Sequence, residues 1–199
     1  MSTGFVLAGG RSRRMGCKKA WLTVGSKALI EIVIDRLRPH VERLVVIGNA
    51  ENARRCRALP VDEVLIDCRP DRGPLMGIFT GLMETRAAVN VFVGCDMPWI
   101  EARLLGRLLS ACDRRTTVVV SRHPLEGIQP LPLICRAEAC RTIGALLNHG
   151  ESSLRALVSQ PAARIVMIEE PELWRSFLNV NTVVDYVQLC DAIALPSRS

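Results

Sequence analysis

The most informative stretch of this sequence reads Gly4-Phe5-Val6-Leu7-Ala8-Gly9-Gly10-Arg11-Ser12-Arg13-Arg14-Met15-Gly16-Cys17-Lys18-Lys19-Ala20. It begins with an apolar run of strand length, and the two adjacent glycines that follow allow backbone torsions and a close approach that side chains forbid. Consecutive N–H groups of such a loop turn toward phosphate oxygens, and the five cations after the glycines neutralise phosphate charge. The pattern predicts a strand that leads into a polyphosphate-binding loop, with a basic surface loop as the alternative.

This loop differs from the two best-known phosphate-binding fingerprints. Five residues separate Gly10 from Gly16, where a Walker loop has four, and neither Ser nor Thr follows the lysines. The dinucleotide fingerprint Gly-x-Gly-x-x-Gly is absent as well. The sequence therefore favours a phosphate-binding loop of another kind.

Outward from this loop, apolar runs of strand length alternate with segments of helical period, which is typical of an α/β fold with a mainly parallel sheet. The expected strands cover residues 4–8, 43–47, 63–67, 90–94 and 117–121. The expected helices between them cover residues 27–37, 51–57, 75–85 and 101–112. We expect one open, Rossmann-like sheet in a three-layer domain, with ligands bound outside the carboxyl ends of its strands.

The sequence after residue 121 has a looser pattern. Pro124, Pro130 and Pro132 interrupt a segment that we expect to form at best an edge strand or a loop wall. Further helices are expected over residues 137–147, 153–158 and 183–194, with a strand over 164–168 and a strand-like stretch over 177–180. No repeat or linker divides the sequence, so we expect one domain over residues 1–199, with halves 1–121 and 122–199.

The composition excludes several classes of protein. The chain has 199 residues, of which 49% are hydrophobic and 23% charged, and this suits a globule with a core rather than a disordered chain. Every apolar run ends well before the ~18 residues of a membrane helix, and the first residues do not resemble a signal peptide. The eight cysteines form neither a Cys-x-x-Cys pair nor a cluster with histidine at zinc spacing, so we expect reduced thiols. These features predict a cytoplasmic protein that binds no membrane.

The net charge of +6 suits either a nucleic acid or a small polyanionic substrate. The charge is concentrated in the loop after the first strand, which holds five cations in nine residues and no acid, whereas signs interleave elsewhere. Aromatic residues do not alternate with these cations, as they do in proteins that stack single-stranded bases. A local polyphosphate site is therefore favoured over a nucleic-acid groove.

The loop Leu7-Ala8-Gly9-Gly10-x-Ser12-x-Arg14-Met15-Gly16-x-x-Lys19 resembles the signature loop of the MobA-like nucleotidyltransferases, in the form found in molybdenum cofactor guanylyltransferases. The resemblance extends over nearly the whole chain and implies a nucleotidyltransferase fold. In that family the glycine pair and a lysine hold the nucleotide phosphates, and relatives that use CTP carry Ala-Ala-Gly instead. The resemblance implies that the nucleotide is bound by Leu7, Ala8, Gly9, Gly10 and Lys19.

Two neighbouring lysines compete for the phosphate-binding role. Lys19 holds the family's lysine position, whereas Lys18 stands where the family often has Asp. The role is therefore shared or ambiguous between them. Arg14 of the same loop is the further cation that we expect to act on the phosphates.

An apolar strand delivers a single acid in Val91-Phe92-Val93-Gly94-Cys95-Asp96-Met97-Pro98. A carboxylate at the end of a strand beside a phosphate loop is the hard oxygen ligand that Mg²⁺ prefers, and an Asp that merely caps a turn is the alternative. The segment resembles the family's metal motif of a strand followed by Cys-Asp-x-Pro. The resemblance implies that Asp96 holds Mg²⁺ against the nucleotide phosphates.

Two further segments resemble nucleotide-contacting parts of the family. Asp67 matches an acid at the end of the third strand, and Gly73 begins a stretch that matches the turn Gly-Pro-Leu-x-Gly. Asp71 is a competing candidate in the same loop. Asn49 follows the second strand one place later than the family's nucleotide-contacting Asn.

The second half carries two segments that resemble the acceptor-binding wall of the family. Gln129 begins Gln-Pro-Leu, where the family has His or Gln before Pro-Leu, and Phe177-Leu178-Asn179-Val180-Asn181-Thr182 resembles its closing Asn-x-Asn-Thr motif. Asn179 and Asn181 are two residues apart in an expected extended segment, so both side chains project to one side and are able to bond one ligand. The alternative is a turn that caps the last helix.

The resemblance implies that the chain transfers GMP from GTP to the phosphate of molybdopterin, with or without molybdenum, and releases pyrophosphate. Because a phosphate nucleophile is already ionised, the expected machinery is loop amides, Lys19, Arg14 and Mg²⁺ on Asp96 rather than a general base. Residues 1–121 are then the nucleotide-binding half and residues 122–199 the acceptor-binding half.

Other functions remain open at this point. One is the same chemistry with CTP or with another phosphorylated acceptor, and another is a nucleotide-binding regulatory protein without turnover. Nucleic-acid binding has only the charge in its favour. The expected partners are GTP and molybdopterin, with molybdoenzymes or cofactor-biosynthesis proteins as candidate protein partners.

Overall fold

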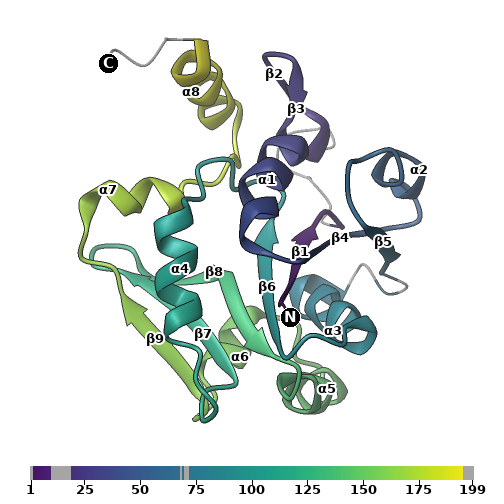
Figure 1. Ribbon diagram of the computed structural model, residues 1–199, viewed down its shortest axis with the longest axis vertical. Helices are drawn as coiled ribbons and strands as arrows, with labels where there is room; N and C mark the ends of the chain where they lie inside the picture. Colours follow the sequence, from purple (N-terminus) through teal and green to yellow (C-terminus); the bar gives the residue numbers. More distant parts are fainter. Residues whose placement is uncertain (1, 10–18, 68, 70–71, 195–199) are drawn as a thin grey trace.

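A computed structural model describes residues 2–9, 19–67, 69 and 72–194 of the chain (Figure 1). Its main sheet has seven strands in the order β5-β4-β1-β6-β8-β7-β9. The strands are β1 Ser2–Leu7, β4 Arg43–Gly48, β5 Glu63–Ile66, β6 Val89–Gly94, β7 Val118–His123, β8 Gly127–Arg136 and β9 Ala163–Met167. All pairings are parallel except those of β8 with β6 and β7. The predicted mainly parallel α/β sheet is confirmed.

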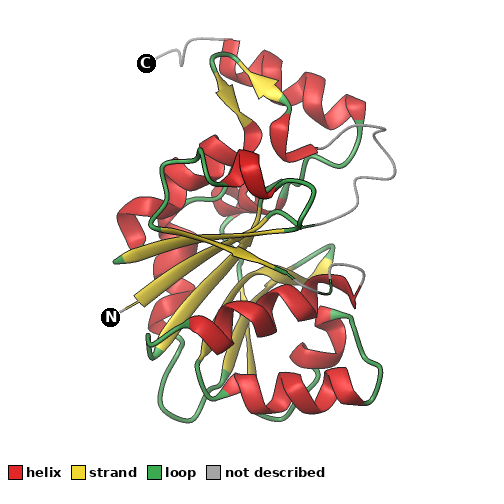
Figure 2. Cartoon of the chain, turned by 90° about the vertical axis from the view of Figure 1, so that its right-hand side faces the viewer, coloured by secondary structure: helices red, strands yellow, loops and turns green. Residues whose placement is uncertain are grey.

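Helices lie on both faces of this sheet, as the side view in Figure 2 shows. The helices are α1 Leu29–Leu37, α2 Ala53–Cys56, α3 Gly73–Glu84, α4 Ala102–Ser110, α5 Ala139–Asn148, α6 Leu154–Val158, α7 Pro171–Trp174 and α8 Val183–Ala194. Short 3-10 turns are η1 Lys19–Trp21, η2 Arg38–His40 and η4 Arg175–Phe177. The helix α7 is the one for which the sequence offered no expectation.

The side chains of β1 alternate between two separate cores, which accounts for the layers. Val6 packs in one core with residues of α1 and α4, whereas its neighbour Phe5 packs in the other with residues of α3, α5 and α6. Phe5 also stacks on Phe92 of β6, with ring centroids 4.6 Å apart. Successive side chains of a strand point to opposite faces, so an unbroken apolar strand is buried on both sides. The expected three-layer arrangement is confirmed.

The proline-containing segment after residue 121 is an interior strand, so the expectation of an edge strand or loop wall is wrong. Strand β8 lies between β6 and β7. Its ladder with β7 pairs Ser121 with Gln129 and Val119 with Ile134, and the register shifts between these two pairs. Pro130 and Pro132 fall within that shift, so their missing N–H groups do not interrupt regular pairing. The prolines mark a bulge rather than an edge.

The expectation of a strand-like stretch over residues 177–180 is also wrong. The chain forms η4 up to Phe177 and then runs without regular structure to the start of α8. Its backbone makes a single bond to the strand-end loop of β6, in which the N–H of Val180 donates to the carbonyl of Asp96 (2.9 Å). This one contact brings the segment to the carboxyl edge of the sheet.

A small hairpin and the last helix form a third apolar cluster. Strands β2 Thr23–Val24 and β3 Lys27–Ala28 pair antiparallel, so α1 begins at Leu29 and not at residue 27 as expected. The hydroxyl of Tyr186 on α8 donates to the carbonyl of Thr23. The buried members of the cluster are Val24, Leu29, Val180 and Leu189. Figure 2 shows the hairpin and α8 together at one end of the molecule. None of the described helices is long and apolar enough to cross a membrane.

Candidate active site

The carboxyl ends of four neighbouring strands are tied together by backbone hydrogen bonds. The N–H of Ala8 donates to Ile47 (2.8 Å), and the N–H of Cys95 donates to Leu7 (3.1 Å). The N–H of Asp67 donates to Gly48 (2.9 Å). The segments that follow β1, β4, β5 and β6 therefore begin at one edge of the sheet, the edge where parallel α/β sheets bind ligands.

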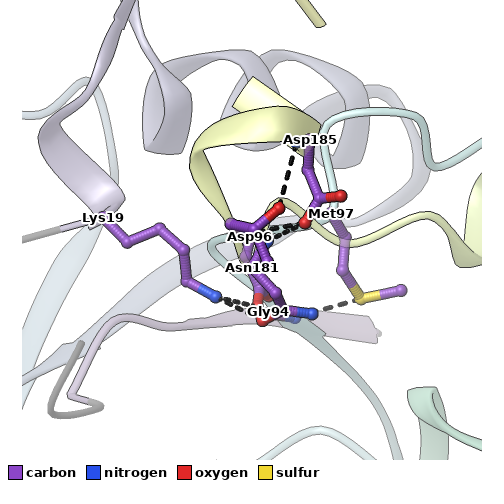
Figure 3. A network of polar contacts seen from close by, with 7 residues as sticks. Lys19, Gly94, Asp96, Met97, Asn181 and Asp185 are labelled. Atoms are coloured by element: carbon purple, nitrogen blue, oxygen red, sulfur yellow. Dashed lines mark hydrogen bonds and ion pairs between the residues drawn. The ribbon is translucent and has the colours of Figure 1, made fainter. Parts of the chain in front are cut away.

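Three of the predicted site residues meet at this edge (Figure 3). The Nζ of Lys19 donates to Oδ2 of Asp96 (2.7 Å) and to Oδ1 of Asn181 (2.8 Å). The side chains of Lys19 and Asp96 are 16% and 24% exposed, so the ion pair is partly shielded from water. Residues from η1, from the end of β6 and from the segment before α8 thus form one group, which we call the Lys19–Asp96–Asn181 group.

Asn181 is held in place by the first turn of α8. The carboxylate of Asp185 accepts hydrogen bonds from the N–H groups of Asn181 and Thr182, both at 2.8 Å. The hydroxyl of Thr182 in turn accepts from the N–H of Asp185 (3.2 Å), which completes a capping box. The bond from the N–H of Asn181 is the main reason why the pKa of Asp185 is lowered from 3.8. The carboxylate therefore stays charged at neutral pH and keeps Asn181 facing Lys19.

The conformation of the Asp96 loop depends on the residue before it. A Cβ on Gly94 would lie 2.3 Å from Oδ1 of Asp96, so only glycine leaves room for this carboxylate. Between them, burial raises the pKa of the Cys95 thiol to about 12, and the charge of Asp96 contributes in the same direction. Burial therefore favours the protonated thiol of Cys95, which is the poorly nucleophilic form.

Asp67 is the second acid at this edge and lies at the end of β5. Its side chain is buried, and burial raises its pKa from 3.8, while the N–H of Arg69 that donates to Oδ1 (2.9 Å) acts in the opposite direction. Burial makes a carboxylate costly to keep charged in the folded protein. The charged form of Asp67 therefore lowers the stability of the folded protein.

Asn49 turns toward the loop that follows β1. Its Nδ2 donates to the carbonyl of Gly9 (3.4 Å), and its Oδ1 accepts from the N–H of Asn52 (3.0 Å). Asn52, which the sequence did not single out, donates from Nδ2 to the carbonyl of Ala8 (2.9 Å). Both asparagines therefore contact the expected nucleotide-binding loop.

The remaining predicted residues lie at separate places. Gly73 is the first residue of α3, and Gln129 lies in β8 with its amide donating to Glu126 (3.5 Å). Asn179 differs from Asn181, because among the described residues its Oδ1 is buried without a hydrogen-bond partner. Gly10, Arg14, Lys18 and Asp71 lie outside the residues that the structure describes.

Sequence reasoning missed Asn52, Asp185 and Gly94. Asp185 had a signal, since Thr182-x-x-Asp185 before an apolar helix follows the capping-box pattern. Asn52 also had one, because an Asn three residues after Asn49 suits a pair of mutual side-chain turns. Neither signal indicates which distant segment the side chains reach, so only the fold reveals their connection to the site.

Among the described residues, the carboxylate that bonds to the ammonium of Lys19 is that of Asp96. Within the described residues, no three side chains of His, Cys, Asp or Glu gather as a preformed metal cluster. Asp96 nevertheless directs its carboxylate toward a cation, the ammonium of Lys19. One protein carboxylate completed by substrate phosphates and water is a common way to hold Mg²⁺. The arrangement fits a metal that arrives with a nucleotide.

Known proteins resemble this chain in sequence or in fold. A protein of Opitutus terrae named probable molybdenum cofactor guanylyltransferase is 37% identical over 180 residues, which cover 86% of this chain and 87% of that protein. Molybdopterin-guanine dinucleotide biosynthesis protein A of Archaeoglobus fulgidus superimposes with a TM-score of 0.80 at 21% identity, covering 98% of this chain and 99% of that chain. A Mycobacterium tuberculosis H37Rv protein, solved as a complex with manganese, superimposes with a TM-score of 0.70 at 23% identity. The superposition covers 96% of this chain and 98% of that chain. The two crystal structures show a common fold.

The sequence of the domain itself identifies the family. The profile of the MobA-like NTP transferase domain matches residues 4–165, which include β1, the loop after it, and Asp96. The match covers well over half of the chain and includes Lys19 and Asp96, whereas Asn181 lies beyond its end. This protein is a nucleotidyltransferase that belongs to the MobA-like NTP transferase family.

Proposed function

We propose that this nucleotidyltransferase is a molybdenum cofactor guanylyltransferase. It transfers GMP from GTP to the terminal phosphate of molybdopterin, or of its molybdenum-loaded form, and releases pyrophosphate. The observation that carries the proposal is the Lys19–Asp96–Asn181 group beside the loop that follows β1. The names of the Opitutus and Archaeoglobus proteins support molybdopterin as the acceptor, and Ala8-Gly9-Gly10 in place of Ala-Ala-Gly supports GTP over CTP.

Lys19 and the loop amides bind the triphosphate. The ammonium of Lys19, which can donate three bonds, donates to the end of β6 and to the segment before α8. A triphosphate that enters here meets a cation on a half-buried side chain, where charge-assisted bonds are stronger than in open water. Gly10 and Arg14, which follow in the sequence, also bind the phosphates in this proposal, and Leu7, Ala8 and Gly9 contact the nucleotide.

The transfer step needs positioning and charge neutralisation. An oxygen of the acceptor phosphate forms a bond to the α-phosphorus of GTP, and the bond from that phosphorus to the bridging oxygen breaks, so pyrophosphate leaves. The nucleophile is already ionised at neutral pH, so no side chain has to remove a proton. Lys19 and Arg14 neutralise the charge that builds up on the phosphates.

A divalent cation, in our proposal Mg²⁺, fits Asp96. When bound, it would neutralise charge on the triphosphate and on the leaving pyrophosphate. Asp96 is the residue that would hold it, since its carboxylate lies at the end of β6 beside the lysine that we expect to bind the phosphates. The manganese in the structurally similar M. tuberculosis protein supports a divalent metal in this fold.

The two halves of the chain divide the substrates. Asp67, Asn49 and Gly73 bind the nucleotide within residues 1–121. Gln129, Asn179 and Asn181 bind the acceptor within residues 122–199. The bond of Asn181 to Lys19 supports this division, because it places a residue of the second half beside the lysine that we expect to bind the phosphates. The protein acts in the cytoplasm, with molybdoenzymes or other cofactor-biosynthesis proteins as its candidate protein partners.

The proposal is tested by titrating the protein with GTP, CTP and ATP in a calorimeter with Mg²⁺ present, and by following pyrophosphate release with molybdopterin added. We expect GTP to bind most tightly and pyrophosphate to appear only when GTP, metal and acceptor are all present. Equal affinity for CTP would reject the guanylyl assignment in favour of a cytidylyltransferase. Tight GTP binding without pyrophosphate release would instead indicate a nucleotide-binding regulator.

A further inference from the structure

We propose that Asn52 is a positioning residue that orients the nucleotide-binding loop after β1. The inference rests on the proposed function, because it assumes that the loop at Ala8 and Gly9 holds GTP. Asn52 touches no substrate in this proposal. It acts through the loop backbone, together with Asn49.

The two asparagines form a closed set of hydrogen bonds with the loop. Asn52 donates from Nδ2 to the carbonyl of Ala8 (2.9 Å) and accepts at Oδ1 from the N–H of Asn49 (2.8 Å). Asn49 donates from Nδ2 to the carbonyl of Gly9 (3.4 Å) and accepts at Oδ1 from the N–H of Asn52 (3.0 Å). Two consecutive carbonyl groups of the loop are thereby held by neighbouring side chains from the end of β4.

The position of Asn52 at the start of α2 does not explain this geometry. An Asn before a helix usually accepts a bond from an N–H of the first turn. Asn52 is the N-cap of α2, yet its side chain makes no capping bond and reaches across to the loop after β1 instead. The side chain is buried, and the partners of its two ends fix which end is Oδ1 and which is Nδ2. The Nδ2 of Asn52 is therefore committed to the loop, while its Oδ1 accepts from the N–H of Asn49 and from the thiol of Cys56 (3.5 Å).

Holding the carbonyl of Ala8 also sets the direction of the next N–H. In a trans peptide the C=O and the following N–H point in opposite directions. Because the carbonyl of Ala8 is drawn toward Asn52, the N–H of Gly9 is directed away from Asn52. The N–H of Ala8 is already bonded to Ile47 (2.8 Å), so the N–H of Gly9 is the first loop donor whose direction Asn52 controls.

The residue at the end of β4 leaves space for this side chain. A Cβ on Gly48 would lie 2.5 Å from Oδ1 of Asn52 and 3.0 Å from Sγ of Cys56. An alanine at position 48 would therefore displace the amide of Asn52 without altering its chemistry. This supplies a second, independent way to break the contact.

The test compares two buried asparagines, Asn52 before α2 and Asn90 in β6. Asn52→Asp keeps the oxygen that accepts from Asn49 but replaces the donor to Ala8 by an oxygen, which repels the carbonyl. Asn90→Asp is the matched control, since Asn90 is also buried and donates from Nδ2 to the carbonyl of Ala87 (3.2 Å), but it lies at the opposite end of β6 from Asp96. Both variants lose a comparable donor, so a purely structural role would affect both alike.

Calorimetric titration with GTP and Mg²⁺, with thermal unfolding measured in parallel, reads out the two effects. We expect Asn52→Asp and Gly48→Ala each to weaken GTP binding about tenfold or more, the scale of one misplaced hydrogen bond. The KM for the acceptor should stay unchanged, because the loop contacts only the nucleotide. Asn90→Asp should lower the melting temperature while the folded protein binds GTP normally.

Two results would overturn the inference alone. One is normal GTP affinity in both Asn52→Asp and Gly48→Ala, and the other is an equal loss of affinity in Asn90→Asp. If Asn52→Asp does not fold, Gly48→Ala decides the question. Failure of the wild-type protein to bind GTP would instead reject the proposed function, and this inference with it.

Discussion

The ammonium of Lys19 lies 2.7 Å from the carboxylate of Asp96, although 77 positions separate the two residues in the sequence. Both side chains are mostly shielded from water, so each charge compensates the other in a site that would otherwise hold an isolated ion. The same ammonium reaches Asn181, which lies beyond the end of the conserved-domain match at residue 165. The two halves of the chain are thus joined at the place where the phosphates are expected to bind.

Replacing Lys19 with Ala should weaken GTP binding by about 1.5–3 kcal/mol, the scale of a charge-assisted contact that is partly desolvated. Lys18→Ala is the matched control and should have a smaller effect, because Lys19 holds both Asp96 and Asn181. Titration calorimetry of both variants makes the comparison. A larger loss in Lys18→Ala would show that the phosphate-binding lysine is the neighbour.

Asp96→Asn should leave most of the GTP affinity but lower turnover by several orders of magnitude. The substitution keeps an oxygen that accepts from Lys19 and removes the negative charge that a metal ligand needs. The measurement pairs GTP binding with pyrophosphate release over a range of Mg²⁺ concentrations. Turnover close to normal with the same Mg²⁺ dependence would show that another residue holds the metal, and Asp67 is the next to test.

Asp67→Asn should stabilise the protein at neutral pH while weakening GTP binding. Burial raises the folded-state pKa of Asp67, so its ionisation opposes folding above that pKa and has no effect well below the unfolded value of 3.8. The gain from removing the charge is on the order of 1 kcal/mol, the scale of one buried polar group. Urea unfolding of both proteins from pH 7 down to pH 3 checks the sign, since the advantage of the variant should vanish on acidification.

Asp185→Ala should cost about 1 kcal/mol of stability at neutral pH, the usual value of a helix cap. The folded-state pKa of Asp185 lies below 3.8, so its contribution is present above 3.8 and is lost as the pH falls through the folded value. The difference between wild type and variant in urea unfolding should therefore shrink at acid pH.

Measuring the activity of Asp185→Ala separates the effect of this variant on stability from its effect on the geometry of the site. Asp113 is the control, because its carboxylate also accepts from a backbone N–H and a hydroxyl group, and the N–H of Arg115 is the main reason why its pKa is lowered. It lies before β7, at the opposite edge of the sheet from Asp96. Asp113→Ala should lose stability and keep its KM for the acceptor. Asp185→Ala should raise that KM, because Asn181 is no longer held toward Lys19. Equal KM values in both variants would remove Asn181 from the acceptor site.

Much of this protein is determined by contiguous residues. The apolar run of β1, the glycine pair after it and the strand that ends at Asp96 are local patterns, and a strand or a strand-end acid is recognisable wherever such a pattern occurs. The main strands and helices up to residue 121 follow from the same alternation, whereas the hairpin of β2 and β3 does not. The loop after β1 and the acid at the end of β6 were recognisable as features of strand ends, and the resemblance to the family singled out Asp67.

Only the tertiary structure decided which distant segments meet. Nothing near Asn181 indicates that its amide lies 2.8 Å from the ammonium of a residue 162 positions earlier, and nothing near Asn52 indicates a bond to Ala8. The prolines of β8 predict an edge strand. In the structure β8 pairs with both β6 and β7 around a bulge and lies inside the sheet. The physical reason is that side-chain partners and strand neighbours depend on how the layers pack. The free energy of that packing depends on contacts between segments from the whole chain, not on one local stretch.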